Sequence, residues 1–349
     1  MIKKLDNKIS CYKNNRSFVS GLKVLAIFGQ LKHSRVDNTQ TYVLSEELSK
    51  DGGTLYKKDV FFNMWISLPS FILSFIPVWL LIKHMDDFKD VEDCDVIVVS
   101  GKKMIRFARH IRHYMFPEAK IVQIGNPYCT IRKNDILLRQ EGSKFLITCK
   151  NTIKINGLLC NKISKEIEEK ECKKYDKIPT MIKGPYIGVF IGGKMFSYKL
   201  TVKNAINFAN IISKISYNMK KPLLILTDKK VGKQVINAIK NNLNCSYYFY
   251  ETKQQGENPK VAFMSWSDYY IIFGNSINDT SEYIMQEKPT YIYVVKEQTK
   301  RYKRFIDKIF NQNDIKVLDE NIEILDSFTP SKLNDLDAIS KQIKSFLGK

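Results

Sequence analysis

Short apolar runs alternate with longer amphipathic stretches along most of this chain. In the first half, "KVLAIFG" (23–29), "CDVIVVSG" (94–101) and "AKIVQIGNP" (119–127) each run into a glycine. Continuous apolar runs of this length, bounded by turn residues, are typical of buried parallel strands. Apolar residues at helical spacing follow around 41–50 and over 102–116. We therefore predict a parallel sheet with helices on both faces.

The same alternation restarts after residue 185. The predicted strands are 186–193, 222–228, 246–251, 269–274 and 290–295, and the predicted helices are 204–219, 233–243 and 258–267. A final segment, "LNDLDAISKQIKSFL" (333–347), has its apolar residues on one helical stripe. This pattern predicts an α/β protein with two doubly wound parallel-sheet domains in series.

A length of 349 residues also favours two domains, because one hydrophobic core rarely grows that large. The best candidate linker is "PTMIKGP" (179–185), which follows a charged run at 161–178. The predicted parts are a flexible basic arm (1–20), an N-terminal domain (21–178), a C-terminal domain (179–330) and a closing amphipathic helix (331–349). The arm has no apolar core of the kind that secretory signals carry.

Residues 60–82, "VFFNMWISLPSFILSFIPVWLLI", carry no charge and are numerous enough to span a bilayer. Pro69 and Pro77 would interrupt a spanning helix, however. Trp65 and Trp79 are of the residue type that prefers a water–hydrocarbon boundary. We therefore expect short helices on the surface of the first domain, with Trp65 or Trp79 partly exposed, that are buried or dip into a membrane surface.

The composition is that of a globular protein with an excess of positive charge. Hydrophobic residues make up 44% of the chain, and 56 Lys and Arg stand against 36 Asp and Glu, for a net charge of +20. Such a charge favours anionic partners, although a compositional bias toward Lys would produce it too. Seven cysteines without a C-x-x-C pair and only four histidines argue against a disulfide framework or a metal site.

Three loops of the second half have residues suited to an anionic ligand. They follow predicted strands, and ligands of such sheets sit at the carboxyl ends of the strands. "IGGKMFS" offers the backbone N–H groups of Gly192 and Gly193 with the charge of Lys194, and "LTDKK" offers Thr227. "FGNSINDTSEYIMQEKP" (273–289) joins a strand to a helix through small polar residues. Together the loops predict a ligand site in the second domain.

The stretch from 254 to 295, with "RYKRFIDKIF" after it, resembles the elongated-mitochondria family of mitochondrial fission proteins and their bacterial relatives. The most specific marks are "GENP" (256–259), "IGG" (191–193) and R-x-x-R-F (301–305). The resemblance implies a GT-B-type arrangement of two Rossmann-like domains, as in glycosyltransferases. The first domain would then face the acceptor and the second would hold the nucleotide.

The resemblance also implies which residues bind the donor. They are Gly192, Gly193, Lys194, Thr227, Gly256, Glu257, Asn258, Asn275, Ser276, Ser281 and Glu282. Glu282 would accept the ribose hydroxyls, although it could instead complement the helix dipole while Thr280 or Ser281 caps the helix. Asn275 and Asn278 depart from the family, which usually has an acidic residue and a second serine in this loop.

A catalytic base would come from the first domain. When the chain is aligned on Gln40, Asp37 falls where the family has a histidine, and His33 lies four residues earlier. Either side chain could accept a proton in an inverting transfer. The donor would be a substrate, and we expect no cofactor and no metal.

Two functions remain open at this stage. The first is a nucleotide-sugar-dependent glycosyltransferase that acts on an acceptor in an anionic membrane or envelope. The second is a non-catalytic membrane adaptor that recruits a dynamin-like GTPase. Both are consistent with a cytoplasmic protein peripheral to a membrane, either the bacterial inner membrane or the mitochondrial outer membrane. RNA binding ranks last, because no aromatic stacking motif accompanies the lysines.

Overall fold

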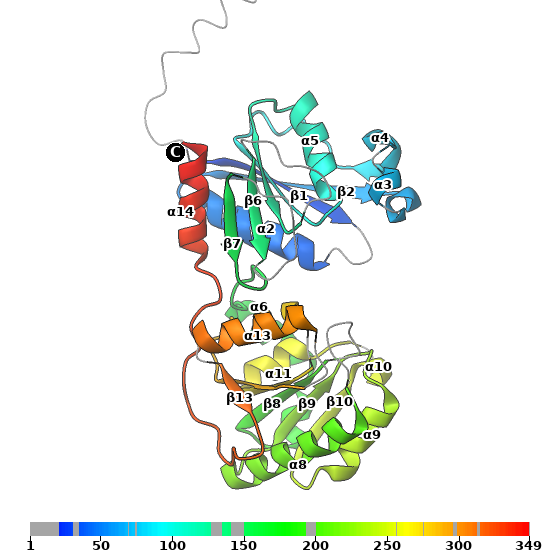
Figure 1. Ribbon diagram of the computed structural model, residues 1–349, viewed down its shortest axis with the longest axis vertical. Helices are drawn as coiled ribbons and strands as arrows, with labels where there is room; N and C mark the ends of the chain where they lie inside the picture. The colour runs from blue at the N-terminus through cyan, green and yellow to red at the C-terminus, as the bar shows by residue number, and fades with distance from the viewer. Residues whose placement is uncertain are drawn as a thin grey trace, which may run out of the picture. The chain divides into compact units, whose positions relative to one another are not determined.

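The computed structural model describes residues 21–30, 35–68, 70–73, 75–126, 135–140, 150–192, 200–255, 257–274, 276–295, 299–312 and 315–348. The chain forms two compact units (Figure 1). The first contains most residues up to 137 together with 340–349, and the second contains 152–339. Each unit contains most of one sheet, although the last strand of the first sheet, Thr152–Ile155, and part of the strand before it, Ile136–Gln140, belong to the second unit.

The sheet of the first unit has the strand order β3-β2-β1-β4-β5-β6-β7. The strands are β1 (Lys23–Gln30), β2 (Thr54–Phe62), β3 (Ile82–Met85), β4 (Val96–Ser100), β5 (Lys120–Ile124), β6 (Ile136–Gln140) and β7 (Thr152–Ile155). β2, β1, β4 and β5 pair in parallel, and β3 is antiparallel to β2. Helices α2 (Arg35–Ser49) and α5 (Met104–Tyr114) pack on this sheet, where apolar strand residues are fully buried.

The sheet of the second unit is parallel, in the order β10-β9-β8-β11-β12-β13. Its strands are β8 (Tyr186–Ile191), β9 (Leu223–Thr227), β10 (Tyr247–Glu251), β11 (Ser267–Phe273), β12 (Thr290–Tyr293) and β13 (Lys316–Leu318). Its helices are α6 (Lys165–Lys174), α7 (Lys177–Met181), α8 (Val202–Met219), α9 (Lys233–Asn242), α10 (Thr252–Gln255), α11 (Lys260–Trp266), α12 (Ile277–Ile284) and α13 (Lys300–Gln312). The core between this sheet and helices α8 and α9 is mostly aliphatic, with the buried aromatic residues Phe208, Phe273 and Tyr291.

Two segments differ from the sequence prediction. Strand β2 was not predicted, and residues 60–62 of the apolar segment belong to it. The charged run at 161–178, which was not predicted as helix, contains α6 and the first two residues of α7. Helix α6 buries none of its side chains, so it has no apolar stripe by which the sequence could predict it.

Short helical turns fill the rest of the apolar segment, as predicted. They are the 3-10 turn η1 (Met64–Ser67), α3 (Ser70–Leu73) and α4 (Val78–Leu81). Trp65 is 57% exposed and Trp79 is 64% exposed, which confirms the expectation for these two side chains. In the described ranges no helix is both long and apolar enough to cross a membrane.

The closing helix, α14 (Leu336–Leu347), returns to the first unit. The ammonium of Lys344 lies 2.5 Å from a carboxylate oxygen of Asp51, and Lys120 Nζ donates to the carbonyl of Phe346 at 2.9 Å. Ile343 is fully buried. The last residues of the chain therefore complete the unit that the first residues begin.

Candidate functional site

The order of the second sheet reverses between β8 and β11. From β8 the chain proceeds outward to β9 and β10, and from β11 it proceeds the other way to β12 and β13. Ligands of doubly wound sheets bind at such a reversal, outside the carboxyl ends of the strands. The backbone N–H of Gly192 donates to the carbonyl of Phe273 at 2.9 Å, so the loops that follow β8 and β11 start side by side. Two of the three predicted ligand loops therefore meet at the reversal.

Helix α12 begins directly after β11, and Ser276 is its N-cap. The hydroxyl of Ser276 accepts from the backbone N–H of Asp279 at 3.1 Å and donates to the Asp279 carboxylate at 2.6 Å. The expectation that Thr280 or Ser281 caps the helix was wrong, because both lie inside α12 and are buried. A serine followed three residues later by an acid is a capping signature, and it could have identified the cap.

A lysine that the sequence analysis missed reaches this helix from α11. Lys260 Nζ lies 2.6 Å from Glu282 Oε2, 3.1 Å from Asp279 Oδ1 and 4.6 Å from the centre of the Tyr283 ring. Its side chain is 16% exposed. The position of Lys260 directly after "GENP" was a weak signal, since its acidic partners lie 19 and 22 residues further on.

The charges of this cluster support one another. Burial opposes the charged form of Lys260, but Tyr283, Asp279 and Glu282 outweigh it and raise the pKa of the ammonium above its usual range. Burial likewise works against ionisation of Asp279, but Lys260 and the Ser276 hydroxyl lower the pKa of this carboxyl overall. At neutral pH the cluster is thus one ammonium between two carboxylates. Such a group can accept hydrogen bonds from sugar hydroxyls and hold its own geometry.

Ser281 does not lie where a ligand could contact it, which corrects its predicted role. It is fully buried, and its hydroxyl donates to the carbonyl of Ile277 at 2.7 Å and accepts from the backbone N–H of Leu158 at 3.1 Å. Gly157 precedes that contact with a φ of +64°, and a Cβ there would lie 2.2 Å from the Ser281 hydroxyl. Ser281 therefore attaches the segment after β7 to α12.

Thr227 and Gly192 are corrected for a similar reason. Thr227 is 1% exposed, and its carbonyl accepts from the hydroxyl of Thr252 at 2.7 Å. The N–H of Gly192 is taken by the carbonyl of Phe273, so it has no hydrogen left to offer a phosphate. Both residues continue the backbone bonding of the sheet rather than presenting donors at its edge.

The "GENP" loop places its two central residues at the surface. Glu257 and Asn258 are exposed. The hydroxyl of Tyr250 donates to the carbonyl of Glu257 at 2.5 Å, and the Asn258 side-chain oxygen accepts from the backbone N–H of Lys260 at 3.0 Å. This loop therefore fixes the start of α11 and, with it, the position of Lys260. The remaining predicted residues, His33, Gly193, Lys194, Gly256 and Asn275, lie outside the described residues.

The first unit has a reversal of its own, between β1 and β4. Asp37 stands there in the first turn of α2, and its carboxylate accepts from the Ser100 hydroxyl at 3.2 Å. A Cβ at Gly101, whose φ is +89°, would lie 2.6 Å from that carboxylate. Burial raises the pKa of Asp37, and the bond from Ser100 offsets the rise only in part. An acid with a raised pKa at a crevice is suited to proton transfer.

Asn38 fixes the start of α2 against the end of β1. Its side-chain oxygen accepts from the backbone N–H of Gly29 at 3.1 Å, and its amide donates to the Gly29 carbonyl at 3.2 Å. This pair of bonds positions Asp37 in the neighbouring turn. Within the residues described, no group of three or more His, Cys, Asp and Glu side chains is gathered in a way that could hold a metal ion.

Comparison with known proteins gives a consistent picture. The model of the family described as "Mitochondrial fission ELM1" matches residues 32–347. The uncharacterized protein RP120 of Rickettsia prowazekii (strain Madrid E) is 24% identical over 316 residues, covering 81% of this chain and 88% of that protein.

Among solved structures, the UDP-GlcNAc 2-epimerase of Methanocaldococcus jannaschii is similar with a TM-score of 0.55, at 11% identity, over 94% of this chain and all of that one. A family 9 glycosyl transferase of Veillonella parvula has a TM-score of 0.45 at 10% identity, over 95% and 99%. The predicted fold class, two Rossmann-like parallel-sheet domains of GT-B type, is confirmed.

Proposed function

The chain belongs to the mitochondrial fission ELM1 family and has a GT-B-like fold, and from this premise we propose that it transfers a sugar from a nucleoside diphosphate to an acceptor in a membrane or envelope. The observation that supports this most is the cluster of Lys260, Asp279 and Glu282, whose two acids lie on the helix that follows β11, next to the reversal of the strand order. The similar archaeal protein is a UDP-GlcNAc 2-epimerase, which makes uridine nucleotides the first to test.

In this proposal, Glu282 accepts hydrogen bonds from the ribose. Its Oε2 pairs with Lys260, and it is 36% exposed, so the second carboxylate oxygen can face a ligand. Lys260 acts as a positioning residue, because its bond fixes the rotamer of Glu282. The diphosphate would lie beside the N-terminus of α12, whose dipole favours negative charge. Gly193 and Lys194, from the loop after β8, would be further partners.

The transfer step needs a group that takes a proton from the acceptor. In an inverting transfer, the acceptor oxygen forms a bond to the anomeric carbon while the bond from that carbon to the phosphate oxygen breaks, and the nucleoside diphosphate leaves with the electron pair. Asp37 is the proposed base, because burial has already raised its pKa toward the working range. His33 remains the second candidate from the sequence.

Isothermal titration with uridine, guanosine and adenosine diphosphates tests the proposal. We expect one base to bind at micromolar to millimolar concentration and the corresponding nucleotide sugar to raise the melting temperature. If the purified protein binds none of them at millimolar concentration, transfer of a sugar from a nucleotide is ruled out for this chain.

The alternative is a non-catalytic adaptor on a membrane that recruits a dynamin-like GTPase. The buried side chains of Thr227 and Ser281, and the occupied N–H of Gly192, favour this alternative, as do Asn275 and Asn278. The adaptor takes first place if nucleotide binding is absent while co-sedimentation with a dynamin-like GTPase is found. Either function would place the protein in the cytoplasm, at a membrane surface.

A further inference from the structure

The segment that follows β2 displays large apolar side chains to solvent. We call residues 61–68, 70–73 and 75–85 the apolar elbow. It holds eight of the nineteen exposed large hydrophobic side chains among the described residues. They are Phe61, Met64, Trp65, Ile72, Phe75, Trp79, Leu80 and Met85. Met64 and Phe75 are each 84% exposed. A concentration of this kind marks a surface that binds something apolar.

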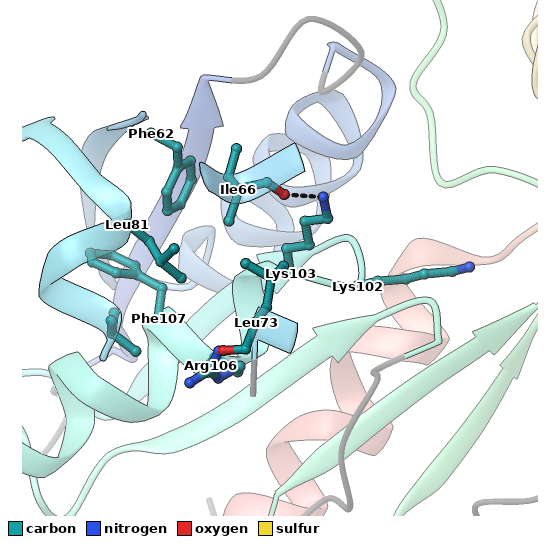
Figure 2. A pocket seen from close by; sticks show the side chains of 9 residues that line it. Phe62, Ile66, Leu73, Leu81, Lys102, Lys103, Arg106 and Phe107 are labelled. Atoms are coloured by element: carbon teal, nitrogen blue, oxygen red, sulfur yellow. Dashed lines mark hydrogen bonds between the residues drawn. The ribbon is translucent and has the colours of Figure 1, made fainter. Parts of the chain in front are cut away.

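The exposed side chains are not required for the core of the elbow itself. Ile66, Leu73 and Leu81 form a small buried cluster, and Phe107 of α5 lies against it (Figure 2). The cavity that they line with Phe62 measures about 30 Å³, enough for a water molecule but not for a ligand. The interior of the elbow is therefore filled by its own side chains and Phe107, and only its outer surface is available to bind a partner.

The polar ends of its backbone turn inward to cations of α5. Lys103 donates to the carbonyl of Ile66 (Figure 2). Arg106 donates to the carbonyl of Leu73 and, at 3.0 Å, to that of Ile76. These carbonyls are the C-terminal groups that short helical turns leave without partners. Two cations of the underlying helix thus satisfy the elbow from inside.

Asn63 satisfies the rest of this backbone. Its amide donates to the carbonyl of Leu80 at 2.5 Å, its N–H donates to the carbonyl of Leu81 at 3.0 Å, and its side-chain oxygen accepts from the N–H of Trp65 at 3.0 Å. These backbone groups are therefore bonded within the protein, while the Trp65 side chain is 57% exposed. In water such bonds stabilise the turns modestly, whereas in hydrocarbon each backbone group must find its partner within the protein.

We propose that the apolar elbow inserts shallowly into the surface of an anionic lipid bilayer. Trp65 and Trp79 are suited to the boundary between headgroups and acyl chains. The elbow has no acidic residue, and Lys83 is exposed at its end. Lys102, on the loop before α5, is among the residues that line the cavity of the elbow, and its side chain extends away from the cavity (Figure 2). Apolar insertion and attraction of lysines to anionic headgroups add to each other.

The acidic residues that follow the elbow weaken this attraction only in part. Asp90 forms an ion pair with Lys58, and Asp87 forms one with Lys89 at 2.8 Å. Asp86 accepts from the backbone N–H of Asp59 at 2.7 Å. These acids are paired or bonded within the protein, so they offset only part of the attraction between the lysines and the headgroups. We expect apolar insertion to supply most of the binding, and the net charge of +20 to make it dependent on salt.

This proposal rests on the proposed function only because that function has its sugar acceptor in a membrane. Lipid binding is measured without nucleotide, so the two can fail separately. Absent titration heat with retained flotation would remove the sugar transfer and keep the elbow. Absent flotation with retained nucleotide binding would remove the elbow and keep the transfer.

Flotation with vesicles of phosphatidylglycerol and phosphatidylcholine is the first test. We expect the protein to float with these vesicles, about tenfold less with pure phosphatidylcholine, and less at high salt. The double variant Phe75→Ser with Trp79→Ser should lose at least about tenfold in partitioning. The matched control is Tyr217→Ser, a 79% exposed aromatic residue on α8, which should float like the unaltered protein. Unchanged melting temperatures exclude misfolding.

Tryptophan emission is the second test. The chain has three tryptophans, so Trp266→Phe leaves the two in the elbow. Their emission should shift to the blue on addition of anionic vesicles, and lipids brominated near the headgroup end of the acyl chain should quench it. Unshifted emission together with equal flotation of the serine variant would overturn the proposal. So would a concentration-dependent dimer that the serine variant abolishes, because the partner would then be a second copy of the chain.

Discussion

Near the reversal between β8 and β11, the ammonium of Lys260 lies between two carboxylates. Near the reversal between β1 and β4, the carboxylate of Asp37 accepts a hydrogen bond from the neutral hydroxyl of Ser100. Both sites lie where the strand order reverses. The same topology thus supports two different electrostatic environments.

The difference separates binding from proton transfer. Paired charges hold their ionised form and their geometry, which suits the recognition of a polar ligand. Burial disfavours the ionised form of Asp37, and the neutral Ser100 hydroxyl compensates only in part. The pKa of Asp37 is therefore raised. We therefore propose ligand recognition near the reversal between β8 and β11, and proton transfer near the reversal between β1 and β4. The following substitutions challenge this assignment.

Lys260→Met should have the largest effect. It leaves Asp279 and Glu282 as neighbouring carboxylates at the ligand edge, where they repel a diphosphate and each other. We expect nucleoside diphosphate affinity to fall about a hundredfold. The free energy of unfolding should fall by about 2 kcal/mol, less than for a fully buried pair because both acids are partly exposed. The matched control is Lys221→Met, which removes the surface pair with Asp268. Equal affinities for the two variants by calorimetry would contradict the assignment.

Glu282→Gln should weaken nucleotide binding by about tenfold to a hundredfold, which is the value of one hydrogen-bonded carboxylate. The free energy of unfolding should change little, because the amide oxygen can still accept from Lys260. Glu287→Gln, which alters an exposed pair with Lys162, provides the control. A loss confined to the diphosphate and absent for the nucleoside would show that Glu282 does not face the ribose.

Ser281→Ala separates structure from recognition within one helix. It leaves the buried N–H of Leu158 without an acceptor, so the free energy of unfolding should fall by about 1–3 kcal/mol, while nucleotide affinity stays within about twofold of the unaltered protein. Ser45→Ala is the control, since the buried hydroxyl of Ser45 has no hydrogen-bond partner among the described residues. A binding loss larger than the stability loss would restore the ligand role predicted from sequence.

Asp37→Asn should have the smallest effect on stability among these variants, and the sign of that effect depends on pH. Because the folded-state pKa of Asp37 is raised, its contribution to stability is present below the unfolded value of 3.8 and is lost as pH rises through the folded value. The melting temperature of the variant minus that of the unaltered protein should therefore increase from pH 4 to pH 8, by roughly 2–4 °C at most. For Asp51→Asn the difference should stay nearly flat over this range and change only below about pH 5, since a hydrogen bond from Lys344 lowers the pKa of Asp51. A flat difference for Asp37→Asn would show that the pKa of Asp37 is not raised.

The sequence predicted the fold well because parallel strands with both faces buried are continuous apolar runs. Strand β4, "VIVVS", is buried throughout and was found easily. Strand β2, "TLYKKDVFF", was missed because three charged residues interrupt it. One of them, Lys58, is 7% exposed and bonds to the carbonyl of Asp87, which no local pattern can reveal.

The candidate site was predicted less completely, because hydroxyl and glycine residues at strand ends have two possible roles. Ser276 and Ser281 look equivalent in the sequence, yet one begins α12 and the other is buried against Leu158. Lys260 was missed because its partners come from another helix. The element that carries a residue can be predicted from local pattern, whereas the side from which its partners come is set by tertiary packing.

The position of α14 has a consequence for the synthesis of the chain. The first unit contains residues 340–349, and the pair of Lys344 with Asp51 joins residues 293 positions apart. A ribosome releases the residues of β1 to β5 long before it releases α14, so the unit that is made first is completed last. Contacts over such sequence distances slow folding. Until then, the face that α14 covers stays open to chaperones.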